Sequence, residues 1–235
     1  MIDLSQNKLK ELNNIPQPRV TRVNLSENEI DSCANFTGHD ALLSLELKKN
    51  KLVNCAGLQN MACLTELFLN ENEITSLKEI RNLPALKKLD VNTNKLESLD
   101  DIPDLPALEH LDIGANVIEK AGELPKLCGL KKLKVLIMAG NPWADEKGDD
   151  LKKEVLIALD ELNIKQVNED EITPEDRADA AEEKKARIQA EKEAEEERAR
   201  EAAEKAAAEA EAAAEGKEEG EAEWKYIFCN KQIIL

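Results

Sequence analysis

A short frame of apolar residues that ends in an asparagine recurs about every 22 residues along the first part of the chain. One copy is Leu64-x-x-Leu67-x-Leu69-x-x-Asn72-x-Ile74. The same asparagine position is filled by Asn7, Asn28, Asn50, Asn72, Asn94, Asn116 and Asn141. About seven copies at so regular a spacing predict a repeat architecture, in which each copy packs on its neighbours.

The spacing within the frame assigns a role to each position. Leu67 and Leu69 are two residues apart, which is the period of a strand, so each copy predicts a short strand whose leucines point to one side. Stacked strands can bury these leucines, and each buried leucine removes apolar surface worth roughly 1.5–3 kcal/mol. The asparagine follows the strand, where its amide can bond backbone groups that would otherwise be buried unpaired. We therefore interpret the asparagines as a structural ladder with no catalytic role.

This frame is typical of a leucine-rich repeat. It predicts an α/β solenoid over residues 1–141, with about seven repeats and a parallel sheet on its concave side. Between the strands, Leu77, Ile80 and Leu83 have helical spacing, which predicts about one turn on the convex side.

The two ends of the repeat block differ from its middle. Ile2 and Leu4 already hold strand positions, so either a partner covers this apolar end or the sequence lacks upstream repeats. After the last repeat the period breaks, and residues 142–168 predict a terminal cap. In this cap Asp150 would cap a helix, and Ile164 and Val167 would lie in a short final strand.

A different kind of sequence begins at Thr173-Pro174, which is a helix-start signal because acids follow in the first turn. Residues 169–215 are rich in Ala, Glu, Lys and Arg with almost no apolar stripe. They predict either a solvated, partly frayed tail or one long helix that projects from the solenoid. Gly216 would end that helix, and the apolar end of segment 216–235 would be either a docking peptide or an error of the gene model.

The composition fits a solenoid followed by a charged tail. The net charge is −17, with 34% charged and 3% aromatic residues, which would be unusual for one compact globule. Neither part has a basic stripe, so nucleic acid is not an expected partner. The chain has no apolar run of about 18 residues and no signal-peptide pattern at its start, so we expect no membrane span and a cytoplasmic or nuclear location.

The five cysteines and two histidines are interpreted as packing residues. Cys33 and Cys55 take the place of a core leucine and Cys63 that of an alanine, so we expect buried, reduced thiols. His39 would fill the core and His110 the surface. The sequence has no Cys-x-x-Cys pair and no catalytic set or phosphate loop, so we expect no metal, no cofactor, no small-molecule substrate and no enzyme activity.

The residues that alternate with the buried leucines would stand in rows on the concave face, where solenoids bind partners. The central row would be Asp3, Asn24, Glu46, Phe68, Asp90, Asp112 and Ile137, and the adjacent row Arg22, Ser44, Glu66, Lys88, His110 and Val135. Most of these side chains would form a solvated face. Exposed apolar residues usually mean contact, so Phe68 and the trio Val135, Ile137 and Ala139 are the candidate anchors. The full set of candidate partner-binding residues is Glu46, Glu66, Phe68, Lys88, Asp90, His110, Asp112, Val135, Ile137 and Ala139.

The frame and its Asn141-Pro142 exit resemble the leucine-rich-repeat class that includes type 1 phosphatase regulators, splicing adaptors and axonemal light chains. Residues 167–180 and the charged stretch after them are similar to the leucine-rich repeat-containing protein twenty-three family, which are radial-spoke components of motile cilia. This resemblance implies a structural subunit of the ciliary or flagellar axoneme, with other axonemal proteins as partners and without catalytic residues. The alternative is a soluble adaptor, either nuclear or phosphatase-regulatory.

Overall fold

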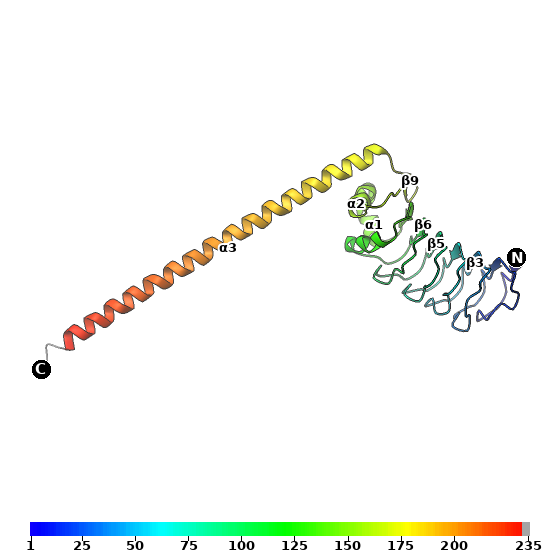
Figure 1. Ribbon diagram of the computed structural model, residues 1–235, viewed down its shortest axis with the longest axis horizontal. Helices are drawn as coiled ribbons and strands as arrows, with labels where there is room; N and C mark the ends of the chain where they lie inside the picture. The colour runs from blue at the N-terminus through cyan, green and yellow to red at the C-terminus, as the bar shows by residue number, and fades with distance from the viewer. Residues whose placement is uncertain (232–235) are drawn as a thin grey trace. The chain divides into compact units, whose positions relative to one another are not determined.

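The computed structural model describes residues 1–231, with side-chain positions for residues 1–206 except Ala121. The chain divides into two units, Met1–Ala181 and Glu182–Leu235. The first unit is a solenoid whose described strands form one nine-stranded sheet in chain order (Figure 1). The predicted fold class, an α/β leucine-rich-repeat solenoid followed by a helical tail, is confirmed.

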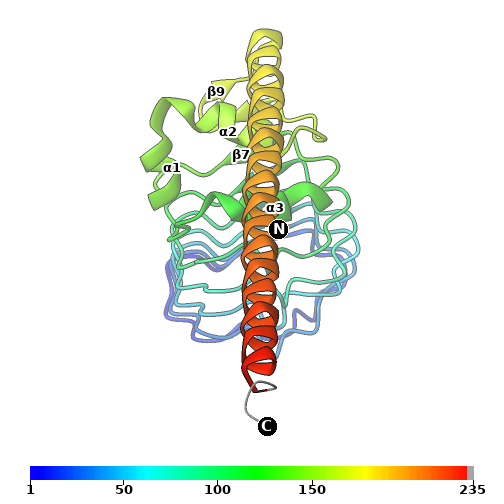
Figure 2. The same ribbon diagram turned by 90° about the vertical axis from the view of Figure 1, so that its left-hand side faces the viewer.

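Strands β1 to β8 pair in parallel, each with the next, and β9 pairs antiparallel with β8. Each strand from β2 to β7 has three residues, with the buried leucine or valine of the repeat at its centre. Figure 2 shows the successive repeats as loops of similar outline, coloured from blue to green. The strand bounds are β1 Ile2–Asp3, β2 Arg22–Asn24, β3 Ser44–Glu46, β4 Glu66–Phe68, β5 Lys88–Asp90, β6 His110–Asp112, β7 Val135–Ile137, β8 Gln166–Val167 and β9 Asp170–Glu171.

The frame leucines form the core. Leu67 and Leu89, at the centres of neighbouring strands, are directly paired in register and fully buried. On the opposite side of the loop between β4 and β5 the chain makes a single turn, in which the Ile80 N–H donates to the Leu77 carbonyl at 3.0 Å. The loop between β6 and β7 instead contains a 3₁₀ helix, η1 Ala121–Gly129. Each repeat therefore contributes one strand and one turn or 3₁₀ helix to a continuous apolar interior.

The ladder asparagines satisfy backbone groups within this interior. The Asn72 Nδ2 donates to the carbonyl oxygens of Leu69 (2.8 Å) and Leu47 (2.9 Å), and the Leu52 N–H donates to its Oδ1 (3.1 Å). Asn7 differs, because it is exposed and bonds only within its own loop. The same three-way pattern recurs at Asn28, Asn50, Asn94, Asn116 and Asn141.

The residue before each ladder asparagine adopts the left-handed backbone conformation. Only Gly140 is a glycine, with φ of 76°. The other positions are Gln6, Glu27, Lys49, Glu71, Thr93 and Ala115, with φ between 47° and 57°. This conformation costs roughly 1–2 kcal/mol for a residue with a Cβ atom, and the ladder bonds on the following residue offset that strain.

The segment predicted to form the cap, residues 142–168, follows the last repeat strand β7 in the chain. The helical segments are the 3₁₀ helix η1 Ala121–Gly129, α1 Pro142–Lys147, the 3₁₀ helix η2 Gly148–Asp150, α2 Leu151–Ala158 and α3 Pro174–Lys231. Helices α1 and α2 seal the core with Trp143 and Val155, both buried. The predicted final strand is confirmed at Val167, but Ile164 lies outside it, because β8 begins at Gln166. Strand β9 was not expected. Asp150 stands at the N-cap of α2, but its side chain makes no capping bond.

Helix α3 begins at the predicted place and is tied to the cap. The Thr173 N–H donates to Asp176 Oδ2 at 2.8 Å, and the Asp176 N–H donates to Thr173 Oγ1 at 3.2 Å, which is a reciprocal N-terminal cap. The Lys152 Nζ lies 2.7 Å from Asp176 Oδ1, and the Arg177 guanidinium donates to the carbonyl of Ile164. The start of α3 thus belongs to the first unit.

Two expectations from the sequence differ from the structure. Helix α3 continues through Gly216 to Lys231, because a glycine lowers helix propensity by about 1 kcal/mol without removing a backbone N–H. Residues 232–235 of the apolar end segment lie outside the described residues. Cys33 and Cys55 are buried as expected, but Cys63 is exposed, since its position lies at the rim of the repeat rather than in the core. No helix among the described residues is both long enough and apolar enough to cross a bilayer.

Candidate partner-binding surface on the concave sheet

The strand register brings the central row together. Glu46 pairs with Phe68, Phe68 with Asp90, Asp90 with Asp112, and Asp112 with Ile137. These side chains point away from the leucine core, on the face that we call the concave face. The adjacent row is also in register and runs through Ser44, Glu66, Lys88, His110 and Val135. The sequence-predicted residues therefore lie side by side on one continuous surface.

Several central-row residues also have a local structural task that the sequence analysis missed. The Asn92 N–H donates to Asp90 Oδ1 at 3.1 Å, which closes a turn at the end of strand β5. An Asp or Asn at the end of a strand is a known turn signal, so the sequence could have indicated this bond. The same bond joins the N–H groups of Ser5, Ser26 and Gly114 to the Oδ1 atoms of Asp3, Asn24 and Asp112, at 3.0, 3.0 and 2.9 Å.

Phe68 interrupts this row of turn-forming side chains. Its ring is half-buried, and the Lys48 and Lys88 Nζ atoms lie 4.4 and 5.3 Å from its centroid. Both distances are within the range of cation–π attraction. Lys48 also forms an ion pair with Glu46 at 3.1 Å. Phe68 is therefore an aromatic side chain that lies near two cationic side chains, with Glu46 and Asp90 as its neighbours in the row.

Ile137 is the second interruption of the row. Val135 and Ile137 are half-buried and Ala139 is exposed. With no carboxylate at position 137, the N–H groups of Met138 and Ala139 donate instead to Asn168 Oδ1, at 2.8 and 3.0 Å. Asn168 comes from the cap, so the cap stabilises the loop that follows this apolar group. The sequence analysis did not identify Asn168, whose role depends on the β8–β9 hairpin.

Burial perturbs two ionisable groups on the concave face. Burial raises the pKa of Asp90, and the neighbouring Asp112 raises it further, whereas Lys88 and Lys48 lower it. Burial and then Lys88 lower the pKa of His110, whereas Asp112 raises it. Asp112 also accepts a bond from Asn92 Nδ2 at 3.3 Å.

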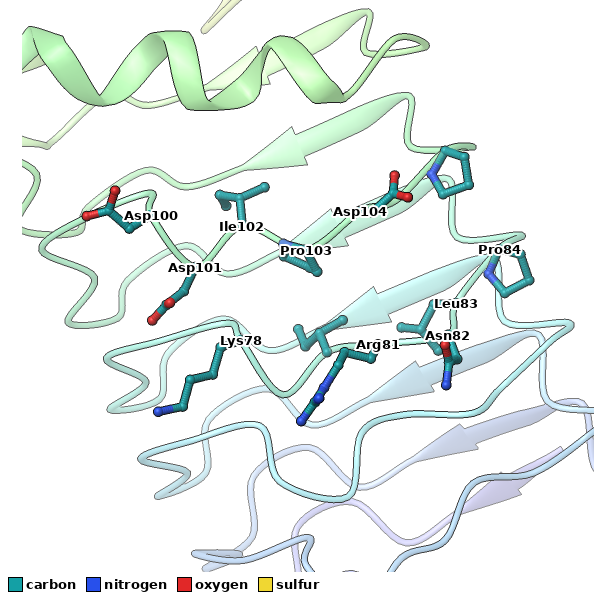
Figure 3. A pocket seen from close by; sticks show the side chains of 12 residues that line it. Lys78, Arg81, Asn82, Leu83, Pro84, Asp100, Asp101, Ile102, Pro103 and Asp104 are labelled. Atoms are coloured by element: carbon teal, nitrogen blue, oxygen red, sulfur yellow. The ribbon is translucent and has the colours of Figure 1, made fainter.

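A groove lies on the convex side, between the turns of two neighbouring repeats. It has a volume of about 650 Å³, with Lys78 and Arg81 on one loop and Asp101 and Asp104 on the next (Figure 3). Asp101 accepts a hydrogen bond from Ser76 Oγ at 2.5 Å, so one of these acids already has a partner. The residues that line this groove include no serine, cysteine or histidine that could act as a nucleophile or base. Among the residues with described side chains, no cluster of three His, Cys, Asp or Glu could hold a metal ion.

Comparison with known proteins agrees with the repeat pattern. The family model for leucine-rich repeats in two copies matches residues 63–105. No curated protein matches the chain. Among solved structures, an internalin (inlF) from Listeria monocytogenes is 19% identical over 66% of this chain and 49% of its own, with a TM-score of 0.47. The chain thus spans about half the length of that structure.

Two further solved structures are similar at low identity. An internalin C2 from the same bacterium is 21% identical over 71% of this chain and 79% of its own, with a TM-score of 0.44. The SNF/U2A′ complex of Drosophila melanogaster is 16% identical over 80% of this chain and 85% of its own, with a TM-score of 0.37. The matched repeats, the same frame on both sides of them and the stacked parallel strands show that the chain has a leucine-rich-repeat solenoid fold.

Proposed function

We propose that the chain is a non-catalytic scaffold that binds another protein through the concave face, with Phe68 as one anchor and Val135, Ile137 and Ala139 as the other. The observation that carries this proposal is Phe68. It is a half-buried aromatic residue in a row where the fold places turn-forming acids and amides. The core gains nothing from this ring, because the side chain points away from it.

The surroundings of Phe68 suit binding. Lys88 in β5 and Lys48, two residues after the end of β3, lie close to the ring and favour one orientation of it before a partner binds. Preorganised aromatic side chains are common binding hot spots, and removing one typically costs 2 kcal/mol or more of binding free energy. Ile137 lies three strands away on the same row, which gives a partner two separate apolar contacts.

We also assign a spacer role to α3. The helix spans 58 residues, which corresponds to a length of about 87 Å at 1.5 Å per residue. Its first turns are fixed to the cap through Asp176 and Arg177. Exposed pairs such as Glu183 and Arg187, 2.9 Å apart, add a few tenths of a kcal/mol each to the helix. Such a helix suits a subunit of a larger assembly.

The cellular setting that we propose is the axoneme of cilia or flagella, with radial-spoke proteins as partners. The similarity of residues 167–180 and of the charged stretch to that family supports this proposal. The alternative is a soluble adaptor in the nucleus or in a phosphatase complex. A tagged protein that stays with salt-washed axonemes would support the first role, whereas a diffuse or nuclear distribution would favour the second.

Affinity purification with mass spectrometry, comparing the parent with Phe68→Glu and Ile137→Glu, tests the binding surface. Each variant is expected to lose the captured partners, because each removes an apolar anchor of a kind that commonly carries 2 kcal/mol or more of binding free energy. In Ile137→Glu the new carboxylate also lies beside Asp112, so its burial under a partner adds a desolvation cost. The melting temperature should stay nearly the same, because neither side chain enters the core. Val53→Glu is the matched control, since Val53 is an apolar residue with 49% exposure outside the concave rows. Normal capture by both concave variants would refute the proposed function.

A further inference from the structure

The carboxylates of Asp90 and Asp112 are not required by the turns that they close. Asn24 holds the same frame position, and its Oδ1 accepts the same backbone bond at 3.0 Å that Asp90 accepts at 3.1 Å and Asp112 at 2.9 Å. A neutral amide therefore completes this turn as well as a carboxylate does. The negative charges at positions 90 and 112 need another explanation.

These charges oppose each other in the free protein. Asp90 and Asp112 are directly paired in register, and neighbouring strands lie about 4.8 Å apart. Like charges in such positions destabilise a sheet. Lys88, in the adjacent row, lowers the pKa of Asp90, but burial and Asp112 together raise it. Burial and Lys88 lower the pKa of His110 in the adjacent row, which disfavours the charged imidazole that could neutralise the pair, whereas Asp112 raises this pKa.

The local structure holds the two carboxylates in place despite this repulsion. The Asn92 Nδ2 donates to Asp112 Oδ1 at 3.3 Å, and the Asn92 N–H donates to Asp90 Oδ1. Gly114 makes room for this amide, since a Cβ atom at Gly114 would lie 2.6 Å from Asn92 Nδ2. All of these bonds use the Oδ1 atoms, so the Oδ2 atoms remain as acceptors on the concave face.

The two anchors of the proposed binding surface lie directly beside this pair. The register runs from Phe68 to Asp90, then to Asp112 and then to Ile137. Across three strand spacings the row covers about 14 Å. The row therefore presents an apolar group, two acids and an apolar group, in that order.

We propose that the concave face binds a protein segment that carries a basic side chain between two apolar ones, with the cation held by Asp90 and Asp112 and the apolar groups by Phe68 and Ile137. This inference rests on the proposed function, because it specifies the partner of the same surface. An incoming ammonium or guanidinium would remove the repulsion between the acids and form charge-assisted hydrogen bonds with Oδ2 atoms that are already oriented. The apolar residues of the segment would be about four positions apart if it is extended, or about nine apart if it is helical.

A selection from displayed random twelve-residue peptides on the intact chain tests this proposal. Selected peptides should carry Arg or Lys between two apolar residues. Their dissociation constants, measured by isothermal titration calorimetry, should rise about tenfold or more for the Asp90→Asn, Asp112→Asn double variant. The dependence of binding on salt should weaken in the same variant. The melting temperature of this variant should not fall, because both amides can still close their turns. Asp3→Asn is the matched control and should change none of these values.

The outcomes separate this proposal from the proposed function. One outcome would be peptides that lose binding to Phe68→Glu but carry no basic residue, or that bind the double variant as well as the parent. This outcome would support the concave face as the binding site, but it would refute the proposal that the partner carries a basic side chain. A selection that gives no peptide dependent on Phe68 would count against both proposals. A large fall in melting temperature for the double variant would show that the charges are structural, and would also refute the inference.

Discussion

Replacing Asn72 by alanine is expected to lower the free energy of unfolding by about 2 to 6 kcal/mol. The estimate follows from the backbone groups that the side chain serves. The Leu52 N–H has Asn72 Oδ1 as its acceptor in the interior, and a buried N–H left without a partner costs about 1–3 kcal/mol. The carbonyl oxygens of Leu47 and Leu69 would each lose one bond but keep another, from Asn50 and Asn94 respectively. Each of these lost bonds contributes about 0.5–1.5 kcal/mol.

The matched control for this prediction is Asn7→Ala. Asn7 holds the same frame position, but it is exposed and bonds only to the carbonyls of Leu4 and Ser5, where water can replace it. We expect this variant to change the unfolding free energy by less than about 0.5 kcal/mol. Urea unfolding of both variants and the parent, followed by far-ultraviolet circular dichroism, gives the comparison. Equal losses for Asn72→Ala and Asn7→Ala would refute the view that the ladder stabilises by satisfying buried backbone groups.

Two further predictions concern the junction between the cap and α3. The pKa of Asp176 is lowered to about 2 by the Lys152 ammonium, the Thr173 N–H and the Thr173 hydroxyl. The ionised Asp176 should therefore stabilise the fold fully above its unfolded pKa near 4, and this stabilisation should be lost as the pH falls from about 4 to 2. Thermal melts of Asp176→Ala should therefore show a smaller loss of stability over this range than the parent, and an equal loss would contradict the assignment. Truncation after Ala181 should leave both the melting temperature of the solenoid and partner capture on the concave face nearly unchanged. Truncation after Val167 should instead destabilise the solenoid, because it removes Asn168, which accepts hydrogen bonds from the Met138 and Ala139 N–H groups. If both truncations melt like the parent, the cap does not depend on Asn168.

The parts of the fold that depend on regular spacing could be predicted from the sequence. The recurrence of the frame leucines fixed the strands, their order and the residues of the core, since a period-two pattern inside a longer repeat leaves few alternatives. The rows of the concave face followed from the same alternation. The ladder asparagines were also identifiable, because each one follows a strand at a constant distance.

Features that depend on contacts between repeats could not be predicted in this way. The hydrogen bond from Asn92 Nδ2 to Asp112 Oδ1 joins two neighbouring repeats, and it has room to form only because Gly114 has no Cβ atom. The role of Asn168 requires the β8–β9 hairpin, which has no counterpart in the repeats. The left-handed residues before the ladder asparagines show no sequence signal, because the repeat imposes that conformation on almost any side chain. The continuation of α3 past Gly216 and Gly220 reflects the cooperativity of a long helix, which these two glycines do not overcome.

The reversal of direction at β9 has a consequence for self-association. A solenoid with an open parallel edge offers a template on which another chain can add a strand in the same direction, and repeated addition would build a fibre. Here β9 is only two residues long, runs antiparallel to β8, and consists of the exposed acids Asp170 and Glu171. A second copy that approached this edge would find only two residues to pair with and would meet two negative charges. The last hairpin of the cap therefore acts as a barrier to polymerisation at this end of the sheet.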